Sequence, residues 1–104
     1  MPANDGVNFR MTLLNASADL FDDNVDAEVE LADGRKFSCT FFTLFNIRSL
    51  MSIYKTSGEC CNGRYFWALD MILVEDLRLQ TLEATIADMI VRGDLEQALS
   101  VISD

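Results

Sequence analysis

The sequence predicts an α+β domain in which a four-stranded, mainly antiparallel sheet carries helices mainly on one face. Two observations predict the sheet. Residues 25–31 alternate strictly between apolar and acidic side chains, and Asp33-Gly34 is a common hairpin signal. A third observation predicts helices, because apolar side chains recur at helical spacing in residues 47–57 and 77–92. The expected order of elements is β-β-β-α-β-α-α.

The length and composition predict a single domain. A chain of 104 residues, half of them hydrophobic, is long enough to bury one core and too apolar to stay disordered. It contains no repeat, linker or low-complexity run, and its only proline is Pro2. We therefore expect one domain over residues 1–104, with an ordered core at about 7–103.

The loop of the hairpin sets the register of its two strands. A three-residue loop, 32–34, pairs Val29 with Phe37, and acidic Glu30 with basic Lys36. A two-residue loop would mix the two faces of a half-buried sheet, so the longer loop is favoured, with its glycine in the left-handed conformation. The same register pairs Ala27 with Cys39, and Val25 with Phe41.

The other elements follow from apolar patterns and capping residues. Further strands are expected at Val7–Leu14 and Tyr65–Val74, the second of them central in the sheet because it is apolar on both faces apart from Asp70. Asn46 is the expected cap of the first helix and Asp76 that of the second. A last helix is expected at Leu95–Ile102, where Asp94 and Gln97 resemble a capping box.

The negative charge is concentrated near the start of the chain. The net charge is −9, and residues 1–33 alone contribute −7 through eight acids and one base. Such a field repels nucleic acid and anionic membranes and attracts a basic partner. The alternative is that acidic side chains only keep the protein soluble. The carboxylates expected to bind a partner lie in one loop and on one strand face, namely Asp22, Asp23, Asp26, Glu28 and Glu30.

The residues needed for most active sites and cofactor sites are missing. The chain has no histidine and no glycine-rich nucleotide motif, so common catalytic and phosphate-binding designs are excluded. Cys60 and Cys61 are adjacent, and together with Cys39 they leave a zinc site one ligand short. A calcium-loop match at residues 22–33 has Ala27 in place of the required glycine. We expect no cofactor and no metal.

A second candidate surface follows the first helix. Arg64, Tyr65 and Trp67 are of the residue types enriched at binding hot spots. If Tyr65 and Trp67 share one strand face, Phe66 lies on the other, and the sequence leaves open which face is core. Asp70, inside an apolar stretch, is a candidate proton donor or acceptor, or alternatively a carboxylate that pairs with an arginine or caps a nearby backbone group.

Together these patterns predict a small acidic protein-binding module without enzymatic activity. In size, charge and lack of active-site residues the chain resembles small acidic bacterial inhibitor or immunity proteins, which would imply a basic partner such as a nuclease. One alternative is a ligand-binding domain or minor enzyme with a pocket near Arg64, Tyr65, Trp67 and Asp70. Another is a self-associating subunit such as a homodimer. The odd number of cysteines and the absence of a visible signal sequence favour the cytoplasm. No membrane or nucleic-acid partner is expected, because the negative charge repels both.

Overall fold

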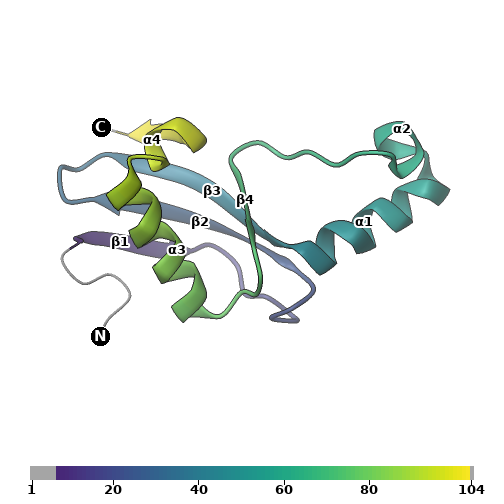
Figure 1. Cartoon of the computed structure of the whole chain (residues 1–104), viewed down its shortest axis with the longest axis horizontal. Helices are drawn as coiled ribbons and strands as arrows, with labels where there is room; N and C mark the ends of the chain where they lie inside the picture. The colour runs from purple at the N-terminus through teal and green to yellow at the C-terminus, as the bar shows by residue number, and fades with distance from the viewer. Residues whose placement is uncertain (1–6, 104) are drawn as a thin grey trace.

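Five strands form one sheet in the computed structural model, which describes residues 7–103 (Figure 1). The spatial order is β1-β2-β3-β4, and β5 also pairs with β3. The predicted α+β class is confirmed, with one strand more than the sequence indicated. The strands are β1 (Phe9–Leu13), β2 (Asn24–Leu31), β3 (Lys36–Thr43), β4 (Met71–Val74) and β5 (Ser100–Ser103).

The predicted hairpin register is confirmed throughout. Val29 lies opposite Phe37 and Glu30 opposite Lys36 in the antiparallel pair β2–β3. The loop is closed by the backbone N–H of Leu31, which donates to the carbonyl oxygen of Arg35 at 2.9 Å. Gly34 has a φ of +95°, the left-handed conformation that the three-residue loop requires. Apolar Val25, Ala27 and Val29 therefore share one face, while the acidic side chains share the other.

One edge of β3 is shared by two strands. Residues 40–43 pair with β4 in parallel, whereas residues 36–38 pair with β5 in antiparallel orientation. The prediction of a helix over Leu95–Ile102 was therefore wrong in its second half. The helix ends at Ala98, and the chain from Ser100 onward forms β5 by pairing with this edge. The predicted capping box is also absent, since the Gln97 side chain donates to the Gly93 carbonyl oxygen instead.

Two of the four helices cover one face of the sheet and enclose the core (Figure 1). The helices are α1 (Leu44–Ser57), α2 (Glu59–Gly63), α3 (Leu79–Arg92) and α4 (Leu95–Ala98). Leu82 and Ile86 of α3 and Leu95 of α4 are fully buried against the apolar sheet face, where Phe37 and Phe41 are the largest side chains. The opposite face of the sheet, which carries the acids of β2, is called the open face below.

Helix α1 begins three residues before the predicted start. The expected cap was Asn46, but the cap is Thr43, whose hydroxyl oxygen accepts a hydrogen bond from the backbone N–H of Asn46 at 3.1 Å. Leu44 follows β3 without a loop, so the strand leads directly into the helix. Gly58 ends α1 in the left-handed conformation, as its position in the sequence predicted.

The apolar stretch of residues 65–74 was wrongly predicted as one central strand. Only Met71–Val74 form a strand, and they lie at an edge of the sheet. Residues 65–68 have no regular secondary structure and lead back from α2 to β4. Because a short apolar run without alternation fits several environments, its composition did not distinguish a core strand from a connecting segment.

Asp76 was expected to cap α3, but Arg78 is the residue at the N-cap, and the buried Asp76 instead holds the turn that leads into this helix. Its Oδ1 accepts hydrogen bonds from the hydroxyl of Thr81 at 2.7 Å and from the backbone N–H of Arg78 at 3.0 Å. These bonds favour the charged carboxylate, with the Thr81 bond contributing most, so they lower the pKa of Asp76 below its ordinary value of 3.8.

This lowered pKa predicts an acid-sensitive contribution to stability. A carboxyl group whose pKa is lower in the folded protein than in the unfolded chain stabilises the folded state. This contribution is complete at a pH above the pKa of the unfolded chain, and it is lost as the pH falls through the pKa of the folded protein. We expect Asp76→Asn to unfold at less urea than the wild type at pH 7, and the difference to shrink between about pH 4 and pH 2. Urea midpoints at several pH values measure this. A difference that stays constant down to pH 2 would contradict it.

Candidate protein-interaction surface

Residues 44–69 form an arm that projects from one end of the sheet (Figure 1). The arm comprises α1, α2 and the segment that returns to β4. Helix α1 contains no buried residue, in contrast to α3. The molecule measures 46 × 27 × 23 Å, and its radius of gyration of 14.6 Å exceeds the roughly 13 Å of a compact domain of this length. The arm therefore accounts for an elongated shape.

Phe66 connects the arm to the sheet. Its ring meets the ring of Phe42 edge to face at a centroid distance of 5.0 Å and stacks with that of Tyr54 of α1 at 6.4 Å. Phe42 lies on the open face, yet it is buried because Phe66 packs against it. Aromatic pairs at such distances are favourable beyond the area that they bury. These three rings therefore form a small second core at the root of the arm.

Helix α2 is a single turn with left-handed backbone geometry. Cys60, Cys61 and Asn62 have φ values of 51°, 54° and 58°. For L-residues this conformation costs roughly 1–2 kcal/mol per residue, so it needs support from its surroundings. Gly63 supplies that support by packing against the backbone of α1, where an added Cβ would lie 2.2 Å from the carbonyl oxygen of Met51. Close contact between α2 and α1 thus reverses the chain toward the sheet.

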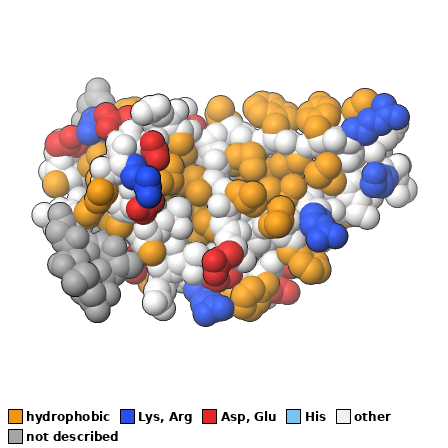
Figure 2. Space-filling model, in the orientation of Figure 1, with side chains coloured by type: hydrophobic (Ala, Val, Ile, Leu, Met, Phe, Trp, Pro, Cys, Tyr) orange, Lys and Arg blue, Asp and Glu red, His pale blue; other side chains and the backbone are white. Residues whose placement is uncertain are grey.

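The arm exposes large apolar side chains. Phe66 points inward, which leaves Tyr65 and Trp67 exposed, with 67% of Trp67 accessible to solvent. The question that the sequence left open is thereby answered in favour of exposure for this pair. Figure 2 shows the hydrophobic side chains gathered over the half of the molecule that contains the arm. The exposed apolar residues of the arm are Leu44, Phe45, Ile53, Tyr65, Trp67 and Leu69.

The outer side of α1 contains a shallow hollow that sequence reasoning missed. Its lining consists of Phe45, Arg48, Ser49, Ser52 and Ile53, and its volume is about 470 Å³. These residues lie off the predicted apolar stripe of α1, which faces α2 and the returning segment. The signal in the sequence was the apolar pair at positions 45 and 53, spaced by about two helical turns and separated by small serines.

The charge of the arm is opposite to that of the rest of the chain. Residues 44–69 contain the bases Arg48, Lys55 and Arg64 and the single acid Glu59, which gives a net charge of +2. The remaining residues contain sixteen acids and five bases, a net charge of −11. Lys and Arg side chains occupy the end of the arm in Figure 2. The molecule is therefore strongly polarised along its long axis.

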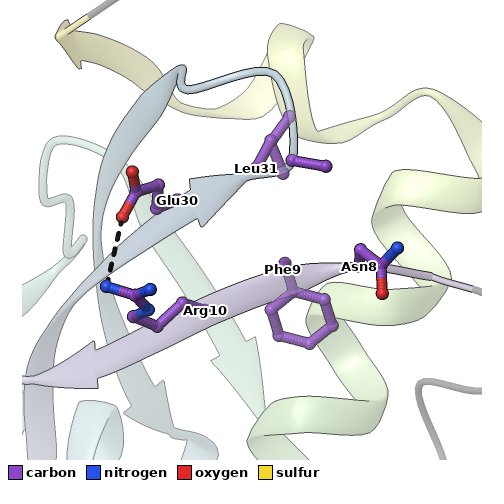
Figure 3. Close-up of a pocket in the computed structure, with 6 residues that line it drawn as sticks. Asn8, Phe9, Arg10, Glu30 and Leu31 are labelled. Carbon is purple, nitrogen blue, oxygen red and sulfur yellow. Dashed lines mark ion pairs between the residues drawn. The ribbon is translucent and has the colours of Figure 1, made fainter.

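The acids predicted on the strand lie on the open face, but only some remain available. Glu30 pairs with Arg10 at 3.8 Å and lies opposite Lys36. Figure 3 shows Arg10 and Glu30 beside a hollow of about 350 Å³ between β1 and β2. Asp26 accepts a hydrogen bond from the Thr40 hydroxyl at 2.6 Å. The side chain of Glu28 makes no hydrogen bond or ion pair with another residue of the described range 7–103.

The loop acids Asp22 and Asp23 stabilise the fold locally. Asp23 accepts hydrogen bonds from the backbone N–H groups of Ala18 at 2.7 Å and Asn24 at 2.8 Å. Asp22 accepts one from the Asn46 side chain at 3.5 Å, which ties this loop to the start of α1. These two carboxylates therefore hold the loop and its junction with α1 in place.

Asp70 holds two strands together and does not join Arg64, Tyr65 and Trp67 in one cluster. Its Oδ1 accepts hydrogen bonds from the backbone N–H and the hydroxyl of Ser100, at 2.9 and 3.0 Å. Its carbonyl oxygen accepts a further bond from the N–H of Thr40. The carboxylate therefore fixes the start of β5 beside β3, the satisfied role that the sequence analysis gave as the alternative.

The three cysteines differ in accessibility, and none forms a disulfide. Burial raises the pKa of Cys39 to about 12, aided by the carboxylates of Asp70 and Asp26, so this thiol stays protonated at neutral pH. Cys61 is exposed, with its Sγ 3.9 Å from Nη1 of Arg64. Within residues 7–103, no group of three or more Cys, Asp or Glu side chains is placed to hold a metal ion.

Comparisons of the chain with protein-family models, with curated proteins and with solved structures found no match. Among the helices of residues 7–103, none has the length and apolar character needed to cross a membrane. The candidate functional surfaces are the exposed arm and the acidic open face.

Proposed function

We propose that this chain is a protein-binding domain without enzymatic activity and that the arm provides its main binding surface. The observation that carries the proposal is the exposure of six large apolar side chains within one projecting element of 26 residues. Exposed large apolar side chains that gather on one part of a protein commonly mark interaction sites, whereas singly scattered ones are ordinary. Trp67 and Tyr65 with Arg64 supply the residue types that dominate binding energies.

The acidic open face supports a second candidate, the binding of a basic protein such as a nuclease. Asp26 and Glu28 lie next to each other along this face, and Glu28 has no basic residue opposite it in β1 or β3. Carboxylates placed this way speed the encounter with a basic surface and make binding sensitive to salt. A cytoplasmic location belongs to the same proposal, because all three thiols are free.

Affinity capture with matched variants tests the proposed function. The immobilised wild-type protein is expected to retain a protein from native lysate, and the double variant Ile53→Ser/Trp67→Ser is expected to lose it. Val91→Ser is the matched control, because Val91 is equally exposed, at 71%, but lies on α3. Retention of the same proteins by the wild type and the double variant would contradict the proposal. Loss of the retained protein at high salt would favour the acidic face as the contact.

A further inference from the structure

The open face combines an apolar edge with uncompensated carboxylates. Leu73 and Met71 of β4 lie on this face, since the alternate residues of the strand belong to the core. The register places Met71 beside Thr40 and Thr40 beside Asp26, so the apolar edge and the acids are two strands apart. Leu73 is 52% exposed, and Glu28 follows Asp26 on the same side of β2.

The outer side of the arm has the matching composition. Its hollow presents apolar Phe45 and Ile53 with the base Arg48. Lys55 follows Arg48 by about two helical turns, on the flank of α1 that meets α2 at Gly63. An apolar strip bordered by bases complements an apolar strip bordered by acids.

Helix α1 continues from the end of β3 and projects beyond it (Figure 1), while Phe66 of the arm covers the open face of its own sheet at Phe42. The side chains of Asp26 and Glu28 form no hydrogen bond or ion pair with a described residue of the arm.

We propose that the partner of the arm is a second copy of this chain, in a twofold dimer in which each arm packs on the open face of the other copy. The inference rests on the proposed function and names the partner. The two copies would lie side by side in opposite directions, which places the +2 arm of each against the −11 body of the other.

Charge reversal on each surface separately tests this arrangement. The first variant, Arg48→Glu/Lys55→Glu, makes the arm acidic, and the second, Asp26→Lys/Glu28→Lys, makes the open face basic. Each variant alone would place like charges in contact at both interfaces, so we expect the dissociation constant of its dimer to rise at least about 100-fold. In an equimolar mixture both interfaces again join opposite charges, so we expect a heterodimer of one copy of each.

Sedimentation velocity and native mass spectrometry measure the outcome. We expect a dimer for the wild type and for the control Arg92→Glu, which changes an exposed charge on α3, and a dimer of mixed mass only when the two variants are combined. Circular dichroism checks that each variant is folded. A wild type that is monomeric at 100 μM would overturn the inference, as would a mixture of folded variants that stays monomeric.

The failure of this inference and that of the proposed function are distinguishable. A monomeric wild type that still captures another protein through Ile53 and Trp67 overturns the second copy as the partner but retains the binding function of the arm. A wild-type dimer that persists unchanged in both charge-reversed variants overturns the arrangement of arm on open face. A monomer from which the arm variant removes no bound protein overturns both.

Discussion

Phe37→Ala is expected to unfold at a temperature at least about 12 °C below that of the wild type. Phe37 is fully buried at the centre of the cluster between the sheet and α3. Truncating a buried phenylalanine removes its transfer free energy and leaves a cavity, at a cost of roughly 3–5 kcal/mol. For a domain near 100 residues each kcal/mol lowers the melting temperature by about 4 °C or more. Since small domains are stable by only about 5–15 kcal/mol, this loss is a large fraction of the total.

The control for this experiment is Phe21→Ala. Phe21 is half exposed and contacts the guanidinium of Arg78 at 5.4 Å from its ring centroid. An exposed cation–π contact contributes about 0.5–1 kcal/mol, so the control should melt within a few degrees of the wild type. Calorimetric scans of both variants measure the difference. Equal melting temperatures for the two variants would show that the core does not lie between the sheet and α3.

Gly63→Ala is expected to release α2 from α1 while the sheet stays folded. The added Cβ would lie 2.2 Å from the carbonyl oxygen of Met51, and this oxygen cannot move unless α1 moves. Gly63 also has a φ of +76°, which costs an L-residue roughly 1–2 kcal/mol. Overpacking adds about 1–3 kcal/mol, so the total is on the order of 3 kcal/mol, concentrated in an element with no buried side chain of its own.

Hydrogen exchange measures this local effect. We expect the amides of α1 to exchange at least roughly 10-fold faster in Gly63→Ala, whereas the amides of β2 and β3 keep their protection. Gly34→Ala is the matched control, because Gly34 also has a positive φ but its Cβ would meet no atom within 4 Å. Gly34→Ala should lose only the stability that corresponds to the unfavourable backbone conformation. The amides of α1 should exchange at the wild-type rate. Faster exchange in every strand of Gly63→Ala would mean that the arm and the sheet unfold as one unit.

The hairpin could be predicted from the sequence because its determinants are local. The alternation in β2 defines two faces, and the three-residue loop then leaves one register that joins like faces. The end of α1 was predictable for the same reason, since Gly58 supplies a left-handed C-cap. In both places the controlling residues are within a few positions of the structure that they determine.

The arm and the last strand could not be predicted because they depend on distant contacts. β5 forms only because residues 36–38 of β3 offer an unpaired edge, and no pattern within Ser100–Ser103 reveals that edge. Similarly, Tyr65 and Trp67 point outward because the ring of Phe66 packs against those of Phe42 and Tyr54. The strand that carries the alternating acids was predicted, but the hydrogen bonds of Asp22 and Asp23 depend on loop geometry that composition does not specify.

The double pairing at the edge of β3 has a consequence for the order of folding. The β2–β3 hairpin joins residues that are close in the chain. On its other edge, β3 pairs at Phe37 with Val101 of β5, a residue far along the chain. Closing such a long loop is entropically costly and slow compared with hairpin formation. Until β5 pairs with it, this part of the edge of β3 is open to pairing with other chains, which favours aggregation of newly made protein. The hydrogen bonds that Ser100 donates to Asp70 then hold β5 in place and keep this edge covered.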